Sequence, residues 1–254
     1  RFARQLGLGA FFSPSGVAIV GASRDQNKLG FGVVKNLHDC GYQGGIYPVN
    51  PRGGEILGYI CYPSVLDVPD PVELAVLIVP VAATPGVMEA CGKRGIRAAI
   101  VVSGGFRESG PEGARIEAEV ASVARRYGMR LMGPNCIGVI DTTTPLDTSF
   151  VAMPQPGNIG FFSQSGAICG GLINWTRGRR IGFSRFVSMG NQADVNETDI
   201  LEFLADDTHT RVLAAYLEGV SDGVRFTAAA RRVSASKPIV VLKVGGTSDG
   251  TRAV

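Results

Sequence analysis

Two stretches decide the fold of this chain, Val17-Ala-Ile-Val-Gly-Ala-Ser23 and Gly160-Phe-Phe-Ser-Gln-Ser-Gly166. Each begins as an apolar segment typical of a buried strand, passes through a turn of small residues and leads into a predicted helix. Such a turn leaves backbone N–H groups free at the positive end of the helix, which suits a phosphate group. A nucleotide-like ligand needs one such turn, so the second one predicts a different phosphate or a covalent phosphoryl carrier.

The composition excludes several classes of protein. With 254 residues, of which 45% are hydrophobic and 19% charged, the chain can bury one large core or two smaller ones, and disorder is not expected. The net charge of +3 is too small and too scattered to predict nucleic acid or a membrane surface as a partner. The apolar runs are too short to span a membrane. The five cysteines are dispersed without a CxxC pair, which is typical of a reducing cytoplasm.

Apolar strand candidates alternate with helical stretches along the chain. This alternation predicts an α/β fold of parallel sheets with helices on both faces. The clearest helix spans 111–127, with proline and acidic residues at its start, basic residues at its end and Gly128 after it. A connector rich in turn residues follows Asp141, and we place a domain boundary there, giving domains of residues 1–146 and 147–254. The predicted strands are 17–20, 45–49, 74–79, 98–102, 130–132, 159–162, 183–187, 212–217 and 239–244.

The first turn limits the choice of cofactor. An NAD-binding turn would be expected to read G-x-G-x-x-G, whereas this one reads Gly21-Ala-Ser23. The second strand ends in Asn50-Pro-Arg52, where a dinucleotide-binding protein usually places an acid for the ribose hydroxyls. Arg52 instead offers positive charge to an extra phosphate. A phosphorylated ribose occurs in both NADP and coenzyme A, and this loop alone leaves the two open.

Five motifs follow one another along the chain: Val-Ala-Ile-Val-Gly-Ala-Ser, Pro-Val-Asn-Pro, Gly-Pro-Asn-Cys-Ile-Gly, Phe-Ser-Gln-Ser-Gly and Ser-Met-Gly-Asn-Gln-Ala-Asp-Val. In this order, the motifs resemble the nucleoside-diphosphate-forming acyl-CoA synthetases, which are relatives of the succinyl-CoA synthetase α-subunit. The resemblance covers 11–250. It implies a Rossmann-like CoA-binding domain followed by a flavodoxin-like parallel α/β domain.

In that family the first domain binds coenzyme A, and the resemblance places its contacts at the ends of the strands. Glycine and proline at these ends let the backbone approach a long, thin ligand closely. The implied contacts are the phosphate-loop residues Gly21, Ser23 and Lys28, then Asn50 and Arg52 at the adenosine end, Val79, Pro80, Ser103 and Gly105 along the pantetheine arm, and Asn135 near the thiol.

The resemblance also assigns roles in the second domain. Ser163, Ser165 and Gly166 match a helix N-terminus that holds a phosphoryl group or an acyl phosphate, and Glu218 matches the acid that orients a phosphohistidine. Hydroxyls and N–H groups at a positive helix end suit a dianion, and a carboxylate can fix the tautomer of an imidazole. The loop 190–195 would lie beside this site. Acidic residues at 194–199 are expected to begin a helix, and no metal is predicted there.

The family reaction converts acyl-CoA, phosphate and ADP or GDP into a small carboxylic acid, CoA and ATP or GTP. The family's carrier histidine follows a glycine-rich stretch that resembles 243–253, so we expect it beyond the end of this chain. His38, His209 and Cys136 are interpreted as structural residues. Nucleotide and Mg²⁺ would then bind to an ATP-grasp domain or a beta-type partner subunit, and an oligomer is expected.

Two other functions remain open at this stage. One is a non-catalytic module that senses acyl-CoA within a larger protein, such as a protein acyltransferase. The other is an NADP-binding oxidoreductase domain built on the same sheet. Neither the acyl group nor the choice between ADP and GDP follows from the sequence.

Overall fold

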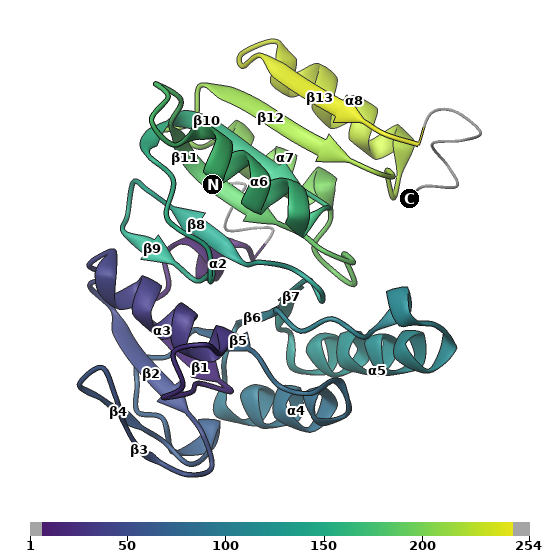
Figure 1. Ribbon diagram of the computed structural model, residues 1–254. Helices are drawn as coiled ribbons and strands as arrows, with labels where there is room; N and C mark the ends of the chain where they lie inside the picture. The colour runs from purple at the N-terminus through teal and green to yellow at the C-terminus, as the bar shows by residue number, and fades with distance from the viewer. Residues whose placement is uncertain (1–6, 246–254) are drawn as a thin grey trace.

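The computed structural model describes residues 7–245, which form two α/β units, one above the other in Figure 1. Every predicted strand is present, with small shifts at the ends. The first unit contains α2 Gly9–Phe12, β1 Gly16–Val20, α3 Leu29–Asp39, β2 Gly45–Val49, β3 Gly54–Ile56, β4 Tyr59–Cys61, the 3₁₀ turns η1 Val65–Asp67, η2 Val81–Ala83 and η3 Arg107–Ser109, β5 Leu74–Leu77, α4 Thr84–Arg94, β6 Ala98–Val101, α5 Pro111–Tyr127 and β7 Arg130–Met132.

The sheet of the first unit is parallel, with the order β2-β1-β5-β6-β7. Alternate residues of its strands point to opposite faces, as the two-residue period of a strand requires. Val17 and Ile19 of β1 pack on the face that α3 covers, whereas Ala18 and Val20 belong to the cluster under α4 and α5. The sheet is therefore buried on both sides, and the carboxyl ends of its strands meet at one edge, where ligands bind in such folds.

The helix predicted at 111–127 is α5, with the same ends. Pro111 stands at its first turn and Gly128 ends it in the left-handed conformation, at φ 65°. Ile116, Val120 and Val123 are buried against the sheet, as their spacing predicts.

The second unit has a six-stranded sheet of order β13-β12-β10-β11-β8-β9. Four of its strands are parallel, but β8 runs antiparallel to β11 and β9 antiparallel to β8. The sequence pattern did not predict β8 and β9, nor the hairpin of β3 and β4, because these strands have only two or three residues and, unlike β7, do not follow a predicted helix. The elements of the second unit are β8 Val139–Asp141, β9 Leu146–Asp147, β10 Pro156–Ser163, α6 Gly166–Thr176, β11 Phe183–Ser188, α7 Glu197–Ala205, β12 Val212–Leu217, α8 Gly223–Ser234 and β13 Ile239–Lys243.

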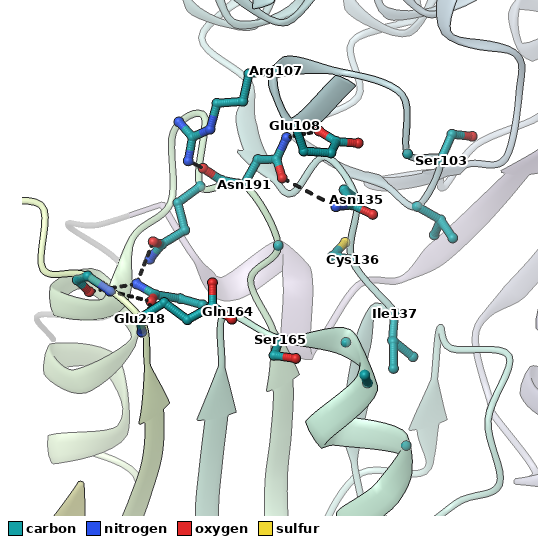
Figure 2. A pocket seen from close by; sticks show the side chains of 18 of the residues that line it. Ser103, Arg107, Glu108, Asn135, Cys136, Ile137, Gln164, Ser165, Asn191 and Glu218 are labelled. Atoms are coloured by element: carbon teal, nitrogen blue, oxygen red, sulfur yellow. Dashed lines mark hydrogen bonds between the residues drawn. The ribbon is translucent and has the colours of Figure 1, made fainter. Parts of the chain in front are cut away.

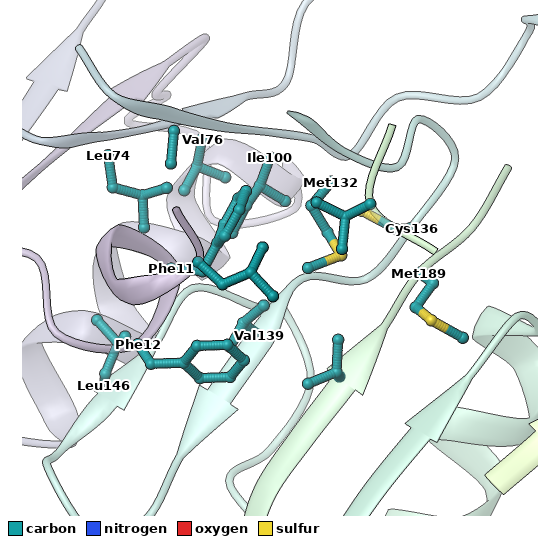
Figure 3. Packing of buried hydrophobic residues seen from close by; sticks show 14 of the residues in the cluster. Phe11, Phe12, Leu74, Val76, Ile100, Met132, Cys136, Val139, Leu146 and Met189 are labelled. Carbon is teal, nitrogen blue, oxygen red and sulfur yellow. The ribbon is translucent and has the colours of Figure 1, made fainter. Parts of the chain in front are cut away.

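One hydrophobic core continues from the first unit into the second. Phe11 and Phe12 of α2 are buried among residues of both sheets, as Figure 3 shows, and the ring of Phe12 stacks on that of Phe203 with centroids 4.2 Å apart. Strand β8 ends at Asp141 and β9 consists of Leu146 and Asp147, and both strands belong to the second sheet. The division at residue 146 stays a prediction.

Backbone hydrogen bonds also join the two units. The loop that follows β11 runs alongside the edge of β7 and the turn after it, where Asn191 N donates to Pro134 O at 2.8 Å and Ala193 N donates to Gly133 O at 2.9 Å. Gly190 has a φ of 56°, and a side chain there would clash with the backbone oxygens of Pro134 and Asn135. The loop 190–195 is thereby fixed over the carboxyl end of the first sheet.

Candidate functional site

The turn after β1 is built from close backbone contacts. Gly21 has a φ of 95°, and a Cβ atom there would clash with the carbonyl oxygen of Ile78. A Cβ atom at Gly30, in the first turn of α3, would clash with the carbonyl oxygen of Gly21. Glycine at both positions therefore lets β1, β5 and α3 meet closely, which positions the loop 22–28 at the strand ends.

A small cavity of about 170 Å³ lies beside this loop and holds three of the predicted CoA residues, Ser23, Asn50 and Arg52. Asn50 Nδ2 donates to Ala22 O at 2.8 Å, and Asn50 Oδ1 accepts from the backbone N–H of Arg52 at 2.9 Å. The first bond connects the ends of β1 and β2, and the second stabilises the turn after β2. Arg52 is exposed and has no ion pair among the described residues, so its guanidinium can bind an anion.

Arg24 also lines the small cavity, but its guanidinium donates to the backbone carbonyls of Gly53 and Glu55. It holds the β3–β4 hairpin against the loop. The residue thereby forms one wall of the small cavity and leaves Arg52 as the cation available to a ligand there.

A second, larger cavity of about 1270 Å³ lies where the two units meet, shown in Figure 2. It brings together five predicted site residues that are far apart in the sequence. Loops at the strand ends of the first unit contribute Ser103 and Asn135, and the second unit contributes Ser165, Gly166 and Glu218. The remaining lining residues are Leu29, Val102, Gly104, Arg107, Glu108, Cys136, Ile137, Phe150, Val151, Gln164, Ala167, Gly170, Gly190, Asn191, Gln192, Gly219, Val220 and Ser221.

The N-terminus of α6 opens into this cavity. Ser165 is the N-cap residue of α6, and its Oγ accepts from the backbone N–H of Ile168 at 3.4 Å. In the part of the chain that the structure describes, the amides of Gly166 and Ala167 have no protein acceptor. These N–H groups and the positive end of the helix dipole are chemically suited to an anion.

Gln164 connects this turn to the predicted acid. Its side-chain oxygen accepts from the backbone N–H groups of Glu218 and Gly219, at 2.5 and 3.0 Å, while its Nε2 donates to Gly219 O and to Gln192 Oε1. The amide thus accepts two hydrogen bonds and donates two, and these bonds hold the end of β12 next to α6. The carboxylate of Glu218 is half-buried and lines the cavity.

A buried carboxylate completes this network behind the cavity wall. Glu197 is fully buried at the start of α7 and accepts from Gln192 Nε2 at 2.8 Å, from Ser221 N at 2.8 Å and from Ser221 Oγ at 3.2 Å. Gln192 has a φ of 56°, a conformation that these bonds help to fix.

A second group of hydrogen bonds joins the two units at the opposite end of the cavity. Asn191 Nδ2 donates to Glu108 Oε2 at 2.6 Å and to Glu117 Oε2 at 2.8 Å. Burial raises the pKa of Glu108, but hydrogen bonds from Asn191 and from the amides of Gly105 and Phe106 outweigh it, and the net pKa is lowered. Glu108 is therefore an ionised anchor for the glycine-rich loop 104–105.

The other predicted residues take different positions. Lys28 is the exposed N-cap residue of α3, and Ser103 Oγ donates to Val79 O at 2.7 Å. Ser163 is fully buried, and its Oγ accepts from Ser165 N at 3.0 Å instead of facing the cavity. The predicted residues that line neither cavity are Gly21, Lys28, Val79, Pro80, Gly105 and Ser163.

Four side chains of the site were not predicted as functional: Gln164, Gln192, Asn191 and Glu108. The first three are amide residues within the quoted motifs, so the sequence showed their hydrogen-bonding capacity but not their partners. Their roles depend on contacts between residues 28 to 83 positions apart, which the sequence does not display.

The histidines and the cavity cysteine are accounted for by local structure. His38 Nδ1 lies 3.0 Å from the hydroxyl of Tyr59, His209 is exposed in the turn before β12, and neither residue lines the large cavity. Cys136 lines the cavity, but burial raises the pKa of its thiol to about 12, which makes it a poor nucleophile. The glycine-rich stretch predicted to precede a carrier histidine lies mostly outside the described residues.

The acidic residues at 194–199 are occupied by internal contacts. Arg130 donates to Asp194 at 2.9 Å and to Asp199 at 3.1 Å, and Arg225 donates to Asp199 at 2.7 Å. Across residues 7–245, no group of three or more His, Cys, Asp or Glu side chains is placed to hold a metal ion. Within the same residues, no helix is both long and apolar enough to cross a membrane.

The fold and the two cavities define a class: a parallel sheet with an arginine-lined cavity at its strand ends, joined to a second α/β unit whose helix α6 begins at a cavity shared by both units. Residues 15–142 match the CoA binding domain family and residues 156–254 match the succinyl-CoA ligase like flavodoxin domain. The first match covers half of the chain, so the chain belongs to the CoA-binding domain family. The two domains in this order confirm the resemblance to the nucleoside-diphosphate-forming acyl-CoA synthetases.

Similar proteins carry related names. The chain is 42% identical over 247 residues to acetate–CoA ligase (ADP-forming) II subunit alpha of Pyrococcus furiosus, covering 97% of this chain and 54% of that subunit. It is 44% identical over 243 residues to acetate–CoA ligase (ADP-forming) I of Archaeoglobus fulgidus, covering 95% of this chain and 35% of that protein. These names support neither an NADP-dependent oxidoreductase nor a sensing module.

A solved structure agrees in fold. The dinucleotide forming acetyl-coenzyme A synthetase 1 of Ca. Korarchaeum cryptofilum, in complex with phosphate and ADP, superposes with a TM-score of 0.93 at 42% identity. The match covers 97% of this chain and 53% of that one. The chain therefore spans about half the length of the synthetase, as it does of the P. furiosus subunit.

Proposed function

We propose that this chain is the CoA-binding and phosphoryl-handling part of an ADP-forming acid–CoA ligase. The ligase would interconvert acyl-CoA, phosphate and ADP with a carboxylic acid, CoA and ATP. The observation that carries the proposal is the cavity between the two units, where strand-end loops of the CoA-binding domain meet the N-terminus of α6 and Glu218. The names of the similar proteins support the same reaction.

Coenzyme A would bind along the carboxyl edge of the first sheet. In this arrangement Arg52, Ser23 and Asn50 hold the phosphorylated ribose end, with Gly21 and Lys28 in the adjoining loop. The pantetheine arm then passes along the strand ends, where the residues are Val79, Pro80, Ser103 and Gly105. The chemistry of the site fits this ligand, because an exposed guanidinium suits phosphate and small residues allow close backbone approach.

The thiol end would reach the large cavity near Asn135. Phosphate bound by the amides of Gly166 and Ala167 attacks the thioester carbonyl, the carbon–sulfur bond breaks and CoA leaves as the thiol. The product is an acyl phosphate at the N-terminus of α6, where the helix dipole stabilises its negative charge. Ser165 and Ser163 shape this turn.

The next step transfers the phosphoryl group to a histidine of the ligase that is neither His38 nor His209. The imidazole attacks phosphorus, the carboxylic acid leaves, and Glu218 would orient the imidazole. ADP and Mg²⁺ would bind to an ATP-grasp domain or a beta-type subunit, so the working enzyme would be an assembly. The cysteines described are all free thiols, which fits the reducing cytoplasm.

A calorimetric titration of the chain with CoA tests the proposal, run beside dephospho-CoA and NADPH. Binding of CoA that weakens when the ribose phosphate is absent is the expected result. Binding of NADPH without binding of CoA would overturn the proposal, because it would assign the strand-end cavity to another dinucleotide.

A further inference from the structure

Resting on the proposed function, we infer that the large cavity contains an acyl-chain subsite, walled by Ile137, Phe150, Val151 and Gly170, that accepts uncharged aliphatic tails longer than acetate. Ligase substrates would then be apolar monocarboxylic acids. Gly170 would set how long a tail the subsite accepts.

The wall of this subsite is contiguous and apolar. Ile137 belongs to the hydrophobic cluster of α6, and Phe150 and Val151 pack against the same cluster. Phe150 and Val151 are only partly buried, and Leu29, which lines the same cavity, has an exposed fraction of 46%. Apolar surface left open in a cavity marks a place where an apolar group binds.

The wall begins where the acyl phosphate would form. A Cβ atom at Gly166 would lie 3.4 Å from Cγ1 of Ile137, so the N-terminus of α6 and the apolar wall are in van der Waals contact. Gly170 follows Gly166 by about one helical turn on the same face. A tail attached to a phosphate at the helix end would therefore extend past Gly170.

The charges in the cavity decide between apolar and acidic tails. Among the described lining residues the charged ones are Arg107, Glu108 and Glu218. Arg107 donates to the carbonyl oxygen of Asn191 and lies 3.5 Å from Glu117, at the end of the cavity away from Ile137 in Figure 2. A second carboxylate in the subsite would lose its water without gaining a cation, which is costly.

Two neighbouring glycines of α6 provide a matched pair for the test. A Cβ atom at Gly170 or Gly171 would have open space around it, with no neighbouring heavy atom within 4 Å, and neither residue has a positive φ. Gly170 lines the cavity, whereas Gly171 is exposed outside it. A leucine at either position should be accommodated, since it replaces a poor helix former by a good one. Only the leucine at position 170 would fill the subsite.

The experiment measures calorimetric affinities of the chain for CoA, acetyl-CoA, butyryl-CoA, hexanoyl-CoA and succinyl-CoA. Each methylene buried in the wild-type subsite should tighten binding by up to about fourfold. Succinyl-CoA should bind at least about tenfold more weakly than butyryl-CoA, which has the same number of acyl carbons. Gly170→Leu should abolish the gain from acetyl-CoA to hexanoyl-CoA and leave CoA binding unchanged, and Gly171→Leu should behave as wild type.

The outcomes separate this inference from the proposed function. If CoA binds but acyl length has no effect, or if the two leucine variants behave alike, the subsite is wrong and the proposed function stands. Binding of succinyl-CoA as tightly as butyryl-CoA would overturn the apolar specificity. If CoA itself does not bind to wild type, both proposals fail. Thermal unfolding of each variant identifies any loss of fold.

Discussion

The turns after β1 and after β10 share a sequence pattern of small residues but form different structures. The first passes through the loop 22–28 before α3 begins at Leu29, and its N-cap residue Lys28 makes no side-chain capping bond. The second reaches α6 in two residues, and Ser165 caps the helix with its hydroxyl. A strand, a small-residue turn and a helix therefore do not by themselves specify one kind of anion site.

The difference lies in what the small residues do. In the first turn, glycine permits backbone packing, and arginine side chains supply the positive charge of the small cavity. In the second, Gly166 and Ala167 line the cavity at the start of α6, and the nearby charged side chain is the carboxylate of Glu218. Both arrangements suit phosphate, the first through a charged guanidinium and the second through backbone N–H donors at a helix end.

Gly21→Ala should have the largest effect. The new Cβ atom would clash with the carbonyl oxygen of Ile78 and strain a residue whose φ is 95°, so the unfolding free energy should fall by about 3 kcal/mol or more. Urea unfolding followed by circular dichroism measures this.

Gly41→Ala is the control for backbone strain, because Gly41 has a φ of 75° and no atom near its Cβ position. It should cost about 1 kcal/mol. In the second turn, Gly166→Ala should cost less than Gly21→Ala, since its Cβ atom would stand at van der Waals distance from Ile137. Equal costs for Gly21→Ala and Gly166→Ala would contradict the contrast between the turns.

Arg52→Ala tests the cation of the first turn. Loss of a charged hydrogen bond to the ribose phosphate should weaken CoA binding by about 1.5–3 kcal/mol, or roughly ten- to a hundredfold. The same variant should bind dephospho-CoA as wild type does. Arg177→Ala removes an equal charge from an exposed position outside both cavities and should change neither affinity. An unchanged CoA affinity in Arg52→Ala would refute the assignment.

The sequence predicted those helices and strands that depend on the preferences of residues near one another in the chain. Helix α5 was predicted with its exact ends, because Pro111 and Gly128 act through their own backbone preferences. Nine strands were found from apolar runs that alternate with predicted helices. The short strands β8 and β9 were missed because they lie outside this alternation; they form through pairing, β8 with β11 and β9 with β8.

The site was predictable only in part, for the same reason. Asn135, Ser165 and Glu218 follow strand ends, and parallel strands bring their carboxyl ends to one edge. The partners of Gln164 are set by the packing of loops distant in sequence, which no local signal reveals. Likewise, Ser163 resembles a ligand residue in its motif, but its hydroxyl is used inside the turn.

Gln164→Glu tests how the second turn holds Glu218. An ionised carboxylate cannot donate to Gln192 Oε1 or Gly219 O, so the unfolding free energy should fall by about 2 kcal/mol above neutral pH. Repulsion from these oxygens raises the pKa of the new carboxyl in the folded state. The deficit should therefore shrink as the pH falls through that raised pKa, because the protonated acid can donate again.

Gln164→Met is the control for this pH dependence. It removes the same hydrogen bonds without adding a titratable group, so its deficit should not change with pH. Urea unfolding at several pH values measures both variants. A deficit in Gln164→Glu that stays constant with pH would show that the amide's donor bonds do not hold the strand end.

Ser165→Ala should have the smallest effect and compares the two helix ends directly. Because the capping bond to Ile168 N is long, at 3.4 Å, its loss should cost about 0.5 kcal/mol. Lys28→Ala at the equivalent position of α3 should leave the unfolding free energy unchanged, since that residue makes no capping bond. If the two variants lose equal stability, the serine hydroxyl does not distinguish the turns, and any binding of an anion at the second turn would rest on the backbone amides of α6 alone.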